Sequence, residues 1–548
     1  MKRILLLKIT VGIFILFLSG LLTPLKAQTN YYFYVQFTDK NNSPYSLSNP
    51  SAFLSARAIA RRTAFNIAID STDLPVNPNY VSQIENLGIH VHNSSKWMNG
   101  TTVILPDSSK MSLVRTLYFV KFVEYTGLLE GAVLAPKQKS KSQITLDYGI
   151  ADAQITQLNG KQLHNEGFTG QGIQIGVIDA GFTNVDTNHA FDSLRLQGRL
   201  LGTKDIINPN SNIFTEDAHG ADVLSIMTGN LPGQFLGTAP EASFWLIRTE
   251  YAPTEYKVET DFWCSGIEFA DSVGVDEVTS SLGYYGFDDP TMSFTYADMN
   301  GKVSRASRAA TVAANKGIVV LVAAGNKGSN AWHYIGSPAD AEGIIAVGAV
   351  TSSGTPSTFT SFGPSYDGRI KPEICSTGTG TAYTNTSGTP STGNGTSYAT
   401  PAMAGMMACL LQKYKVTNPT LNVQILLQSV FKTGNLFNNP TEQMGYGIPD
   451  FVLAEQNLPI YESLHEIEKN NFSLAYNTTY KTLIIRFTNG VNPVNSNIRI
   501  YSVTGDLIIN QTLSDSPTVI RTEQFTPGIY AVSVIENGKT VTQKIVIN

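Results

Sequence analysis

The sequence predicts an α/β protein built around a parallel sheet with helices on both faces. Short apolar runs alternate with helical stretches in residues 148–457, a pattern typical of such a sheet. Strand and helix patterns are mixed in residues 28–140, which indicates a small α+β domain. Short strands and turns fill residues 460–548, which predicts a small all-β sandwich.

Length and composition set the general class. With 548 residues the chain is too long for one ordinary domain. Hydrophobic residues make up 42% and charged residues 15% of the chain, so large buried cores are expected and global disorder is not. The net charge is −5 and no basic block or basic aromatic stripe is present, so we expect no nucleic acid partner.

Residues 1–27 have the pattern of a secretory signal peptide. Two basic residues near the start precede the apolar run 9–22, and Pro24 and Ala27 follow it. An uncleaved membrane anchor is the alternative, but the run is short for a membrane span. We therefore expect export across the inner membrane and a secreted or cell-surface protein.

The next region, residues 28–140, combines a strand YYFYVQFT with an amphipathic helix AFLSARAIARRTAF. We interpret Arg57, Arg61 and Arg62 as the solvated face of that helix. The polar and basic segment 136–143 predicts an exposed linker.

Histidines and cysteines give weaker indications. His90 and His92 share one face of a predicted strand, but we find no third ligand, so a metal site there is disfavoured. The chain has three cysteines, which is a small and odd number, so a disulfide scaffold is not expected. Cys264 and Cys375 could pair, which the sequence leaves open, and Cys409 is predicted to be a small core residue.

Strands and helices alternate in the central region. The predicted helices are 261–274 and 304–317. The carboxyl ends of parallel strands meet at one edge of a sheet and commonly carry functional groups. The predicted buried strands are 173–178, 243–248, 276–281, 318–324 and 344–350.

Ser397 begins a helix in the stretch GNGTSYATPAMAG. A helix start carries unpaired backbone N–H groups and the positive end of the helix dipole, which would stabilise an oxyanion beside this serine. The small neighbouring residues would let a carbonyl approach the backbone closely. A nucleophilic serine is one interpretation, and an ordinary helix start is the other.

Candidate partners of this serine lie at two strand ends and one helix start. Asp179 directly follows a buried strand, whereas Asp217 and other nearby aspartates are interpreted as surface turns. His219 lies in the first turn of a predicted helix, and its rivals His189 and His333 do not begin a buried helix.

Asn326 follows the strand IVVLVAA, and its side-chain amide could donate to an oxyanion. The alternative is an ordinary turn asparagine beside Gly325.

The order of these residues separates the serine-hydrolase families. Aspartate, histidine and serine follow one another as in subtilisin, whereas chymotrypsin has histidine first and α/β-hydrolases have serine first. Ser397 lies in GTSYA, which lacks the second glycine of the G-x-S-x-G elbow. Over residues 148–457 the chain resembles the subtilisin-like serine proteases, the subtilases. The motifs that carry the resemblance are VIDAGF, AHGADV, SSLGY, AAGN, FTSFGPSYDGRIKPEI and GTSYATPAMAG.

The resemblance implies a role for each candidate. Ser397 would be the nucleophile, His219 the general base and acid, and Asp179 the orienting carboxylate. Asn326 would stabilise the oxyanion together with the backbone N–H of Ser397. The residues implied to bind the substrate are Ser281, Leu282, Gly283, Ala323, Ala324 and Gly325.

The chain departs from the family pattern in three ways. Asp222 replaces a second histidine that is common in the family, and Ala180 stands where Ser or Thr is common. No clear calcium loop is present, so no motif supports the structural calcium that many members hold. We expect no cofactor for catalysis and no metal among the site residues.

Both flanking regions carry looser resemblances. Residues 28–140 resemble a subtilase propeptide, which implies an intramolecular inhibitor, and a permanent N-terminal domain is the alternative. Residues 460–548 resemble the C-terminal sorting domain of type IX secretion in Bacteroidetes, which implies the secretion machinery as a partner. The Tyr-Pro-Asn-Pro often found there is absent, since LAYNTTY takes its place. An adhesive or spacing module is the alternative.

The sequence thus predicts a secreted serine endopeptidase that acts on proteins or peptides through an acyl-enzyme intermediate. A non-catalytic surface binding protein on a protease scaffold is the alternative. A metallohydrolase is disfavoured because no H-E-x-x-H helix occurs. Lys327 suggests acidic side chains before the scissile bond, unless it is a solvated loop lysine.

Overall fold

The computed structural model describes residues 30–106, 108–129, 146–417 and 422–458, and a set of strands with short connections between 472 and 547. The predicted signal peptide 1–27 and linker 136–143 lie outside the described residues. The chain divides into two compact units, Met1–Leu458 and Pro459–Asn548, which are described separately.

Seven parallel strands form the central sheet of the first unit, in the order β13-β12-β11-β10-β5-β9-β6. This arrangement confirms the predicted fold class. The predicted strands are found at nearly the expected positions, and β6 and β13 were not predicted. The strands are β5 (Gln174–Asp179), β6 (Leu200–Asp205), β9 (Ser243–Arg248), β10 (Glu277–Ser280), β11 (Val319–Ala323), β12 (Ile345–Val350) and β13 (Ile374–Thr377).

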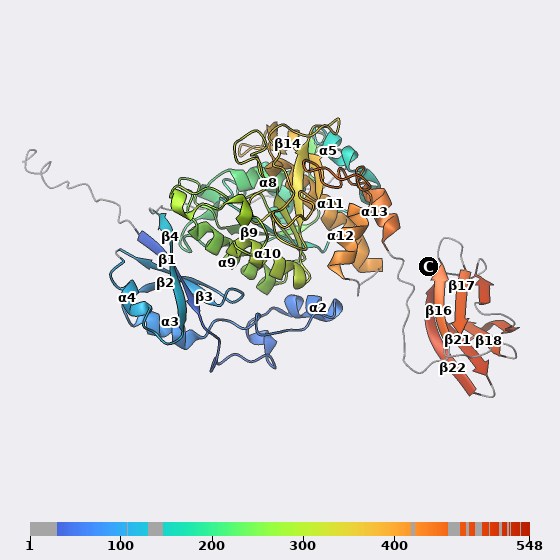
Figure 1. Ribbon diagram of the computed structural model, residues 1–548. Helices are drawn as coiled ribbons and strands as arrows, with labels where there is room; N and C mark the ends of the chain where they lie inside the picture. The colour runs from blue at the N-terminus through green and yellow to red at the C-terminus, as the bar shows by residue number, and fades with distance from the viewer. Residues whose placement is uncertain are drawn as a thin grey trace, which may run out of the picture. The chain divides into compact units, whose positions relative to one another are not determined.

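Helices cover both faces of this sheet (Figure 1). Alternate residues of each strand point to opposite faces, so Val177 and Ile178 of β5 belong to two different buried clusters. The first cluster packs against α8 (His219–Thr228) and α11 (Thr396–Thr417), and the second against α9 (Val258–Val273) and α10 (Arg305–Asn315). Burial on both faces explains why strands such as β11 and β12 are continuous apolar runs.

Shorter elements complete this part of the chain. They are α5 (Asp152–Gln157), α6 (Lys161–Asn165), α7 (Asp192–Leu196), α12 (Val423–Phe431), α13 (Phe451–Asn457), β7 (Asn230–Leu231), β8 (Phe235–Leu236), β14 (Thr379–Thr384) and β15 (Pro390–Asn394).

The N-terminal domain is an antiparallel sheet in the order β2-β3-β1-β4, with helices against it. Strands β1, β2 and β4 contact α9, and Figure 1 shows the blue strands beside this helix. Glu268 of α9 accepts hydrogen bonds from the Ser95 hydroxyl and from the backbone N–H groups of Lys96 and Trp97. The elements are β1 (Asn30–Phe37), β2 (His90–Ser95), β3 (Gly100–Leu105), β4 (Val120–Leu129), α2 (Ala56–Ala64), α3 (Pro78–Glu85) and α4 (Met111–Val114).

The prediction that the arginines of α2 face solvent is wrong. Arg61 and Arg62 are only 6% and 1% exposed. Arg61 lies 2.5 Å from a carboxylate oxygen of Asp271, and Arg62 lies 2.9 Å from the other oxygen and 2.6 Å from Asp73. Arg57 pairs with Asp276. The polar face of this helix therefore meets the carboxylates of Asp73 and, far away in sequence, of Asp271 and Asp276 instead of water.

The second unit consists of two antiparallel sheets, β16-β17-β20 and β19-β18-β21-β22. Apolar residues of both sheets share one buried cluster, which confirms the predicted β-sandwich. The strands are β16 (Phe472–Asn477), β17 (Thr482–Phe487), β18 (Asn497–Ser502), β19 (Leu507–Thr512), β20 (Thr518–Arg521), β21 (Gly528–Glu536) and β22 (Lys539–Ile547).

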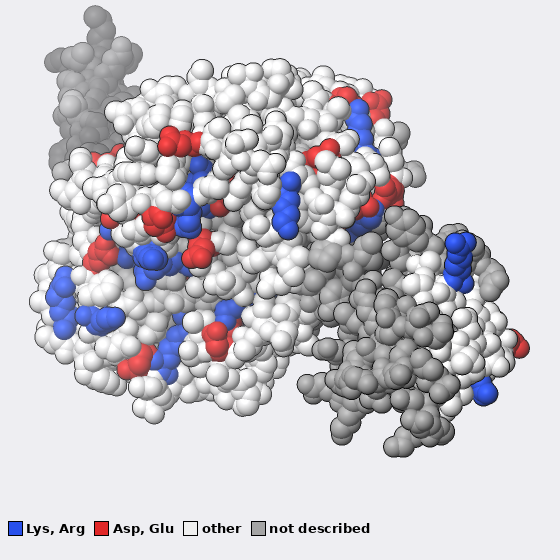
Figure 2. Space-filling model, turned by 45° about the vertical axis from the view of Figure 1, so that its right-hand side comes forward, with Lys and Arg blue, Asp and Glu red and all other residues white. Residues whose placement is uncertain are grey.

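Three further expectations from the composition concern the surface charge, the cysteines and membrane-spanning helices. On the face drawn in Figure 2, acidic and basic side chains are interspersed and no broad basic field is visible. Cys264, Cys375 and Cys409 are buried and unbridged, so the pairing that the sequence left open is not formed. Among the described residues, none of the helices has the length and apolarity that a membrane span requires.

Candidate active site

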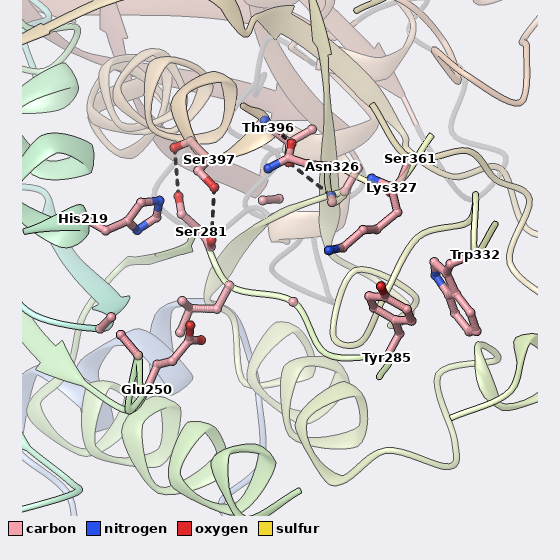
Figure 3. Close-up of a pocket in the computed structure, with 18 of the residues that line it drawn as sticks. His219, Glu250, Ser281, Tyr285, Asn326, Lys327, Trp332, Ser361, Thr396 and Ser397 are labelled. Atoms are coloured by element: carbon pink, nitrogen blue, oxygen red, sulfur yellow. Dashed lines mark hydrogen bonds between the residues drawn. The ribbon is translucent and has the colours of Figure 1, made fainter. Parts of the chain in front are cut away.

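A pocket of about 280 Å³ lies at the carboxyl ends of the central strands (Figure 3). Strands β10 and β11 end at its walls, and helices α8 and α11 begin there. Nine of the ten residues predicted from the sequence line it, and Asp179 lies behind His219. The nine are His219, Ser281, Leu282, Gly283, Ala323, Ala324, Gly325, Asn326 and Ser397.

Asp179 and His219 are in direct contact. The His219 Nδ1–H donates to Asp179 Oδ1 at 2.8 Å, and the backbone N–H of Ala180 donates to the same oxygen at 2.8 Å. Asp179 is fully buried, and its Oδ2 has no hydrogen-bond partner among the described residues. Because Nδ1 is held as the donor, Nε2 of the ring is the nitrogen free to accept a proton.

Several carboxyl groups act on His219. Burial has the largest influence and favours the neutral ring, but the charge and hydrogen bond of Asp179, with Glu250 and Asp217, outweigh it. The pKa of His219 is raised to about 9. Asp217, interpreted from the sequence as a surface turn, lines the pocket and accepts the backbone N–H of His219.

Ser397 is the second residue of α11 and is almost buried. Its hydroxyl donates to the carbonyl of Ser281 at 3.3 Å, and the Ser281 hydroxyl donates to the carbonyl of Ser397 at 3.0 Å. Figure 3 shows the His219 ring beside this pair. The serine hydroxyl must leave the Ser281 carbonyl before it can donate to His219.

Pro401 explains why the Ser397 carbonyl is available to Ser281. In an α-helix the N–H of residue 401 would donate to the carbonyl of residue 397, but proline has no N–H. Pro401 lies inside α11, four residues after Ser397. The proline thus leaves the Ser397 carbonyl free to accept the Ser281 hydroxyl, and this hydrogen bond links the start of α11 to the segment after β10.

Asn326 is oriented by the residue before Ser397. Its Oδ1 accepts the backbone N–H of Thr396 at 2.8 Å and the Thr396 hydroxyl at 3.0 Å. A backbone N–H can only donate, so the acceptor must be the amide oxygen. The Nδ2 group is therefore left for the pocket, on the same side as the start of α11.

The sequence did not single out Glu250, which lines the pocket after β9. Burial, followed by the carboxyl groups of Glu255 and Asp179, raises the pKa of Glu250 to about 8. Burial also raises the pKa of Asp222, on the His219 helix, to about 7. An acid directly after a buried strand was the signal that selected Asp179, and SFWLIRTE carries a weaker form of it, because Thr249 separates Glu250 from the strand.

Lys327 reaches over the Tyr285 ring, with its ammonium nitrogen 5.2 Å from the ring centroid. Trp332 stacks on the same Tyr285 ring, with a distance of 4.7 Å between the ring centroids. All three side chains line the pocket, so Lys327 is a pocket residue and not simply a loop lysine. Its charge also lowers the pKa of Glu255, although burial, the largest influence, raises it.

The predicted histidine pair does not gather a third ligand. The ring of His92 contacts the carbonyl of Ile206 at 2.8 Å. Within the described part of the chain, no group of three or more His, Cys, Asp or Glu side chains is arranged to hold a metal ion.

Comparisons with known proteins give three matched regions. Residues 170–447 match the subtilase family, residues 32–144 the peptidase S8 propeptide domain of Bacteroidota, and residues 477–548 the secretion system C-terminal sorting domain. These matches confirm the resemblances stated from the sequence motifs. The sorting domain indicates export to the medium or the cell surface.

Individual relatives match over the central region. Subtilisin NAT of Bacillus subtilis subsp. natto is 31% identical over 261 residues, which are 47% of this chain and 61% of that protein. Subtilisin of Bacillus pumilus is 30% identical over 261 residues, 47% of this chain and 84% of that protein. The solved structure of the prenylagaramide maturation protease PagA matches with a TM-score of 0.43 and 20% identity, over 55% of this chain and 98% of that one. The family match to residues 170–447 shows that this chain belongs to the subtilase family.

Proposed function

We propose that this protein is an exported serine endopeptidase that hydrolyses peptide bonds through Asp179, His219 and Ser397. The observation that carries the proposal is the 2.8 Å contact between Asp179 Oδ1 and His219 Nδ1 at the edge of a pocket that also holds Ser397. His219 and Ser397 line a pocket that an extended peptide could enter, and the buried Asp179 contacts His219 from behind. A buried carboxylate, an imidazole and a serine are the groups that acyl transfer requires.

In this mechanism Ser397 Oγ attacks the peptide carbonyl while His219 Nε2 takes its proton. The oxyanion of the tetrahedral intermediate accepts hydrogen bonds from Asn326 Nδ2 and the Ser397 backbone N–H. His219 then gives the proton to the leaving amine, the C–N bond breaks, and an acyl-serine remains. Water hydrolyses this ester by the same proton transfers, and Asp179 stabilises the imidazolium throughout.

A fluorophosphonate probe tests the proposal at the proposed nucleophile. The secreted protein should be labelled covalently, and peptide mapping should locate the label on Ser397. Labelling should compete with a peptide substrate for the same site. An unlabelled protein that also cleaves no peptide would favour the non-catalytic binding protein instead.

Replacing Asn326 by alanine is expected to lower kcat by about 10²–10³, the size that loss of this donor has in subtilisin itself. The reason is that Nδ2 would donate to the oxyanion and not to the ground-state peptide. KM should change little, which steady-state kinetics on one peptide would measure. A raised KM with unchanged kcat would contradict the proposed role.

The flanking regions fit an exported zymogen. We assign residues 28–140 to a propeptide that inhibits the active site, residues 148–457 to the catalytic domain, and residues 460–548 to sorting by the secretion machinery. Residues 1–27 would be the signal peptide that directs export across the inner membrane. N-terminal sequencing of the secreted protein tests both processing sites, and deletion of residues 460–548 should abolish export.

Lys327 is proposed to favour an acidic side chain at the residue whose carbonyl is attacked. Peptides with Asp or Glu at that position should have a kcat/KM about tenfold above their Asn and Gln counterparts, the range of a partly exposed ion pair. Lys327→Gln should remove the preference. Lys302→Gln, which removes an exposed lysine elsewhere, should retain it, and equal loss in both variants would contradict the proposal.

A further inference from the structure

The pocket also holds an acidic side chain, Glu250, that the proposed mechanism does not use. Glu250 follows β9 and lines the pocket together with Asp217, His219, Ala252 and Leu282. The residue is half-buried and lines the pocket, so a ligand that enters the pocket can contact it. In Figure 3, Glu250 and Lys327 lie on opposite sides of the segment that begins at Ser281.

An extended peptide would present its side chains to these two groups in turn. Consecutive side chains of an extended chain point to opposite sides. The residue whose carbonyl lies between Ser397 and Asn326 would point its side chain between Ser281–Gly283 and Ala323–Gly325, toward Lys327. The residue before it would then point the other way, toward His219 and Glu250.

The surroundings of Glu250 are acidic. The pKa of Glu250 is raised by burial and by the carboxyl groups of Glu255, Asp179 and Asp217. The charge of His219 lowers it. Glu259 is a further buried acid of this cluster, and one of its oxygens has no hydrogen-bond partner among the described residues. A cation placed beside Glu250 would therefore relieve repulsion among several carboxyl groups.

We propose that Glu250 is a specificity-determining residue that binds the Lys or Arg side chain of the substrate residue immediately before the one whose carbonyl is attacked. This inference rests on the proposed peptidase function. It also predicts that the preferred cleavage site combines two opposite charges in a fixed order, basic and then acidic. The two preferences come from different side chains and can be removed separately.

Matched peptides test the inference on the full secreted protein. At pH 9, where the Glu250 carboxyl group is ionised, pairs that differ only by Lys or Gln at this position should differ about tenfold in kcat/KM, the range of a partly exposed ion pair. In Glu250→Gln the ratio should fall to near one. In Glu255→Gln, which removes a neighbouring acid that does not line the pocket, the ratio should persist or rise, because loss of this charge lowers the pKa of Glu250. Equal loss of the ratio in both variants would overturn the inference in favour of a diffuse negative field.

A second measurement needs no variant. Glu250 is faced by His219, Asp179, Asp217 and Glu255, and its pKa is raised to about 8, so the free carboxyl group becomes charged as the pH rises through that value. The Lys/Gln ratio of the unaltered protein should therefore increase from pH 7 to pH 9. The titration of His219 affects both peptides equally and cancels in the ratio.

The possible failures are distinguishable. Hydrolysis of both peptides at equal rates, or a ratio independent of pH, would overturn this inference and leave the peptidase function standing. Absence of hydrolysis of every peptide, together with absence of fluorophosphonate labelling, would overturn both.

Discussion

Ser397→Ala is expected to lower kcat for peptide hydrolysis by about 10⁶, the effect of removing the same nucleophile in subtilisin itself. The alanine variant keeps the oxyanion donors but has no oxygen to form the acyl-enzyme, so only slow attack by water remains. The fold should be preserved, because the Ser397 hydroxyl makes a single 3.3 Å hydrogen bond to a backbone carbonyl. A continuous fluorogenic peptide assay, with thermal unfolding as the check on folding, measures both.

Ser281→Ala is the matched control for this variant. It removes another hydroxyl that lies in the same pocket and bonds to the Ser397 carbonyl. We expect a loss of no more than about tenfold, since a neutral hydrogen bond contributes about 1 kcal/mol. Peptide hydrolysis by Ser397→Ala at the parent rate would show that the nucleophile is elsewhere.

Asp179→Asn is expected to lower kcat by about 10⁴, the size found for the corresponding change in a serine-protease triad. An asparagine amide can donate to Nδ1, which would move the ring proton to Nε2, the atom that must accept the serine proton. Removing the negative charge also lowers the pKa of His219 from its raised value of about 9. The general base must be neutral, so kcat/KM of the parent rises with pH toward that value, and this acid limb should move to lower pH in the variant.

The pH profile separates the two effects of Asp179→Asn, which are the change of the His219 tautomer and the lower pKa of His219. Asp222→Asn removes a carboxyl group from the same helix without removing the contact to Nδ1, so it should shift the acid limb with less than about tenfold loss of kcat. If Asp179→Asn behaved like Asp222→Asn, with a moved limb and nearly full kcat, the orienting role of Asp179 would be excluded.

The residues of the candidate site could be predicted because each follows a strong local signal. Asp179 ends an apolar strand, Asn326 follows another, and His219 and Ser397 lie in the first turns of helices. Parallel strands bring such ends to one edge, so local patterns and chain order were sufficient to group them. The orientation of the Asn326 amide group and the hydrogen bonds between Ser397 and Ser281 depend on side-chain positions. No pattern in the sequence encodes these positions.

Other features depended on partners distant in sequence. Arg61 and Arg62 lie on a polar helix face, and the pattern could not distinguish water from a carboxylate such as Asp271 as their neighbour. Glu250 became a candidate only when the pocket showed that it faces His219. Strand β6 was missed because Lys204 and Asp205 interrupt its apolar pattern.

The ion pairs of the α2 arginines hold the N-terminal domain against the following region. Cleavage of the chain between these two parts would therefore not by itself release one from the other. Arg61, Arg62 and Lys96 of the N-terminal domain all reach Asp271, and Arg305 of the catalytic region reaches Glu124 in return. These ions are largely buried, so added salt screens them weakly, and leaving one of them unpaired costs about 3–5 kcal/mol. A protease nicked between the two domains would therefore remain a tightly held two-piece complex, and freeing the enzyme would require digestion or unfolding of the detached piece.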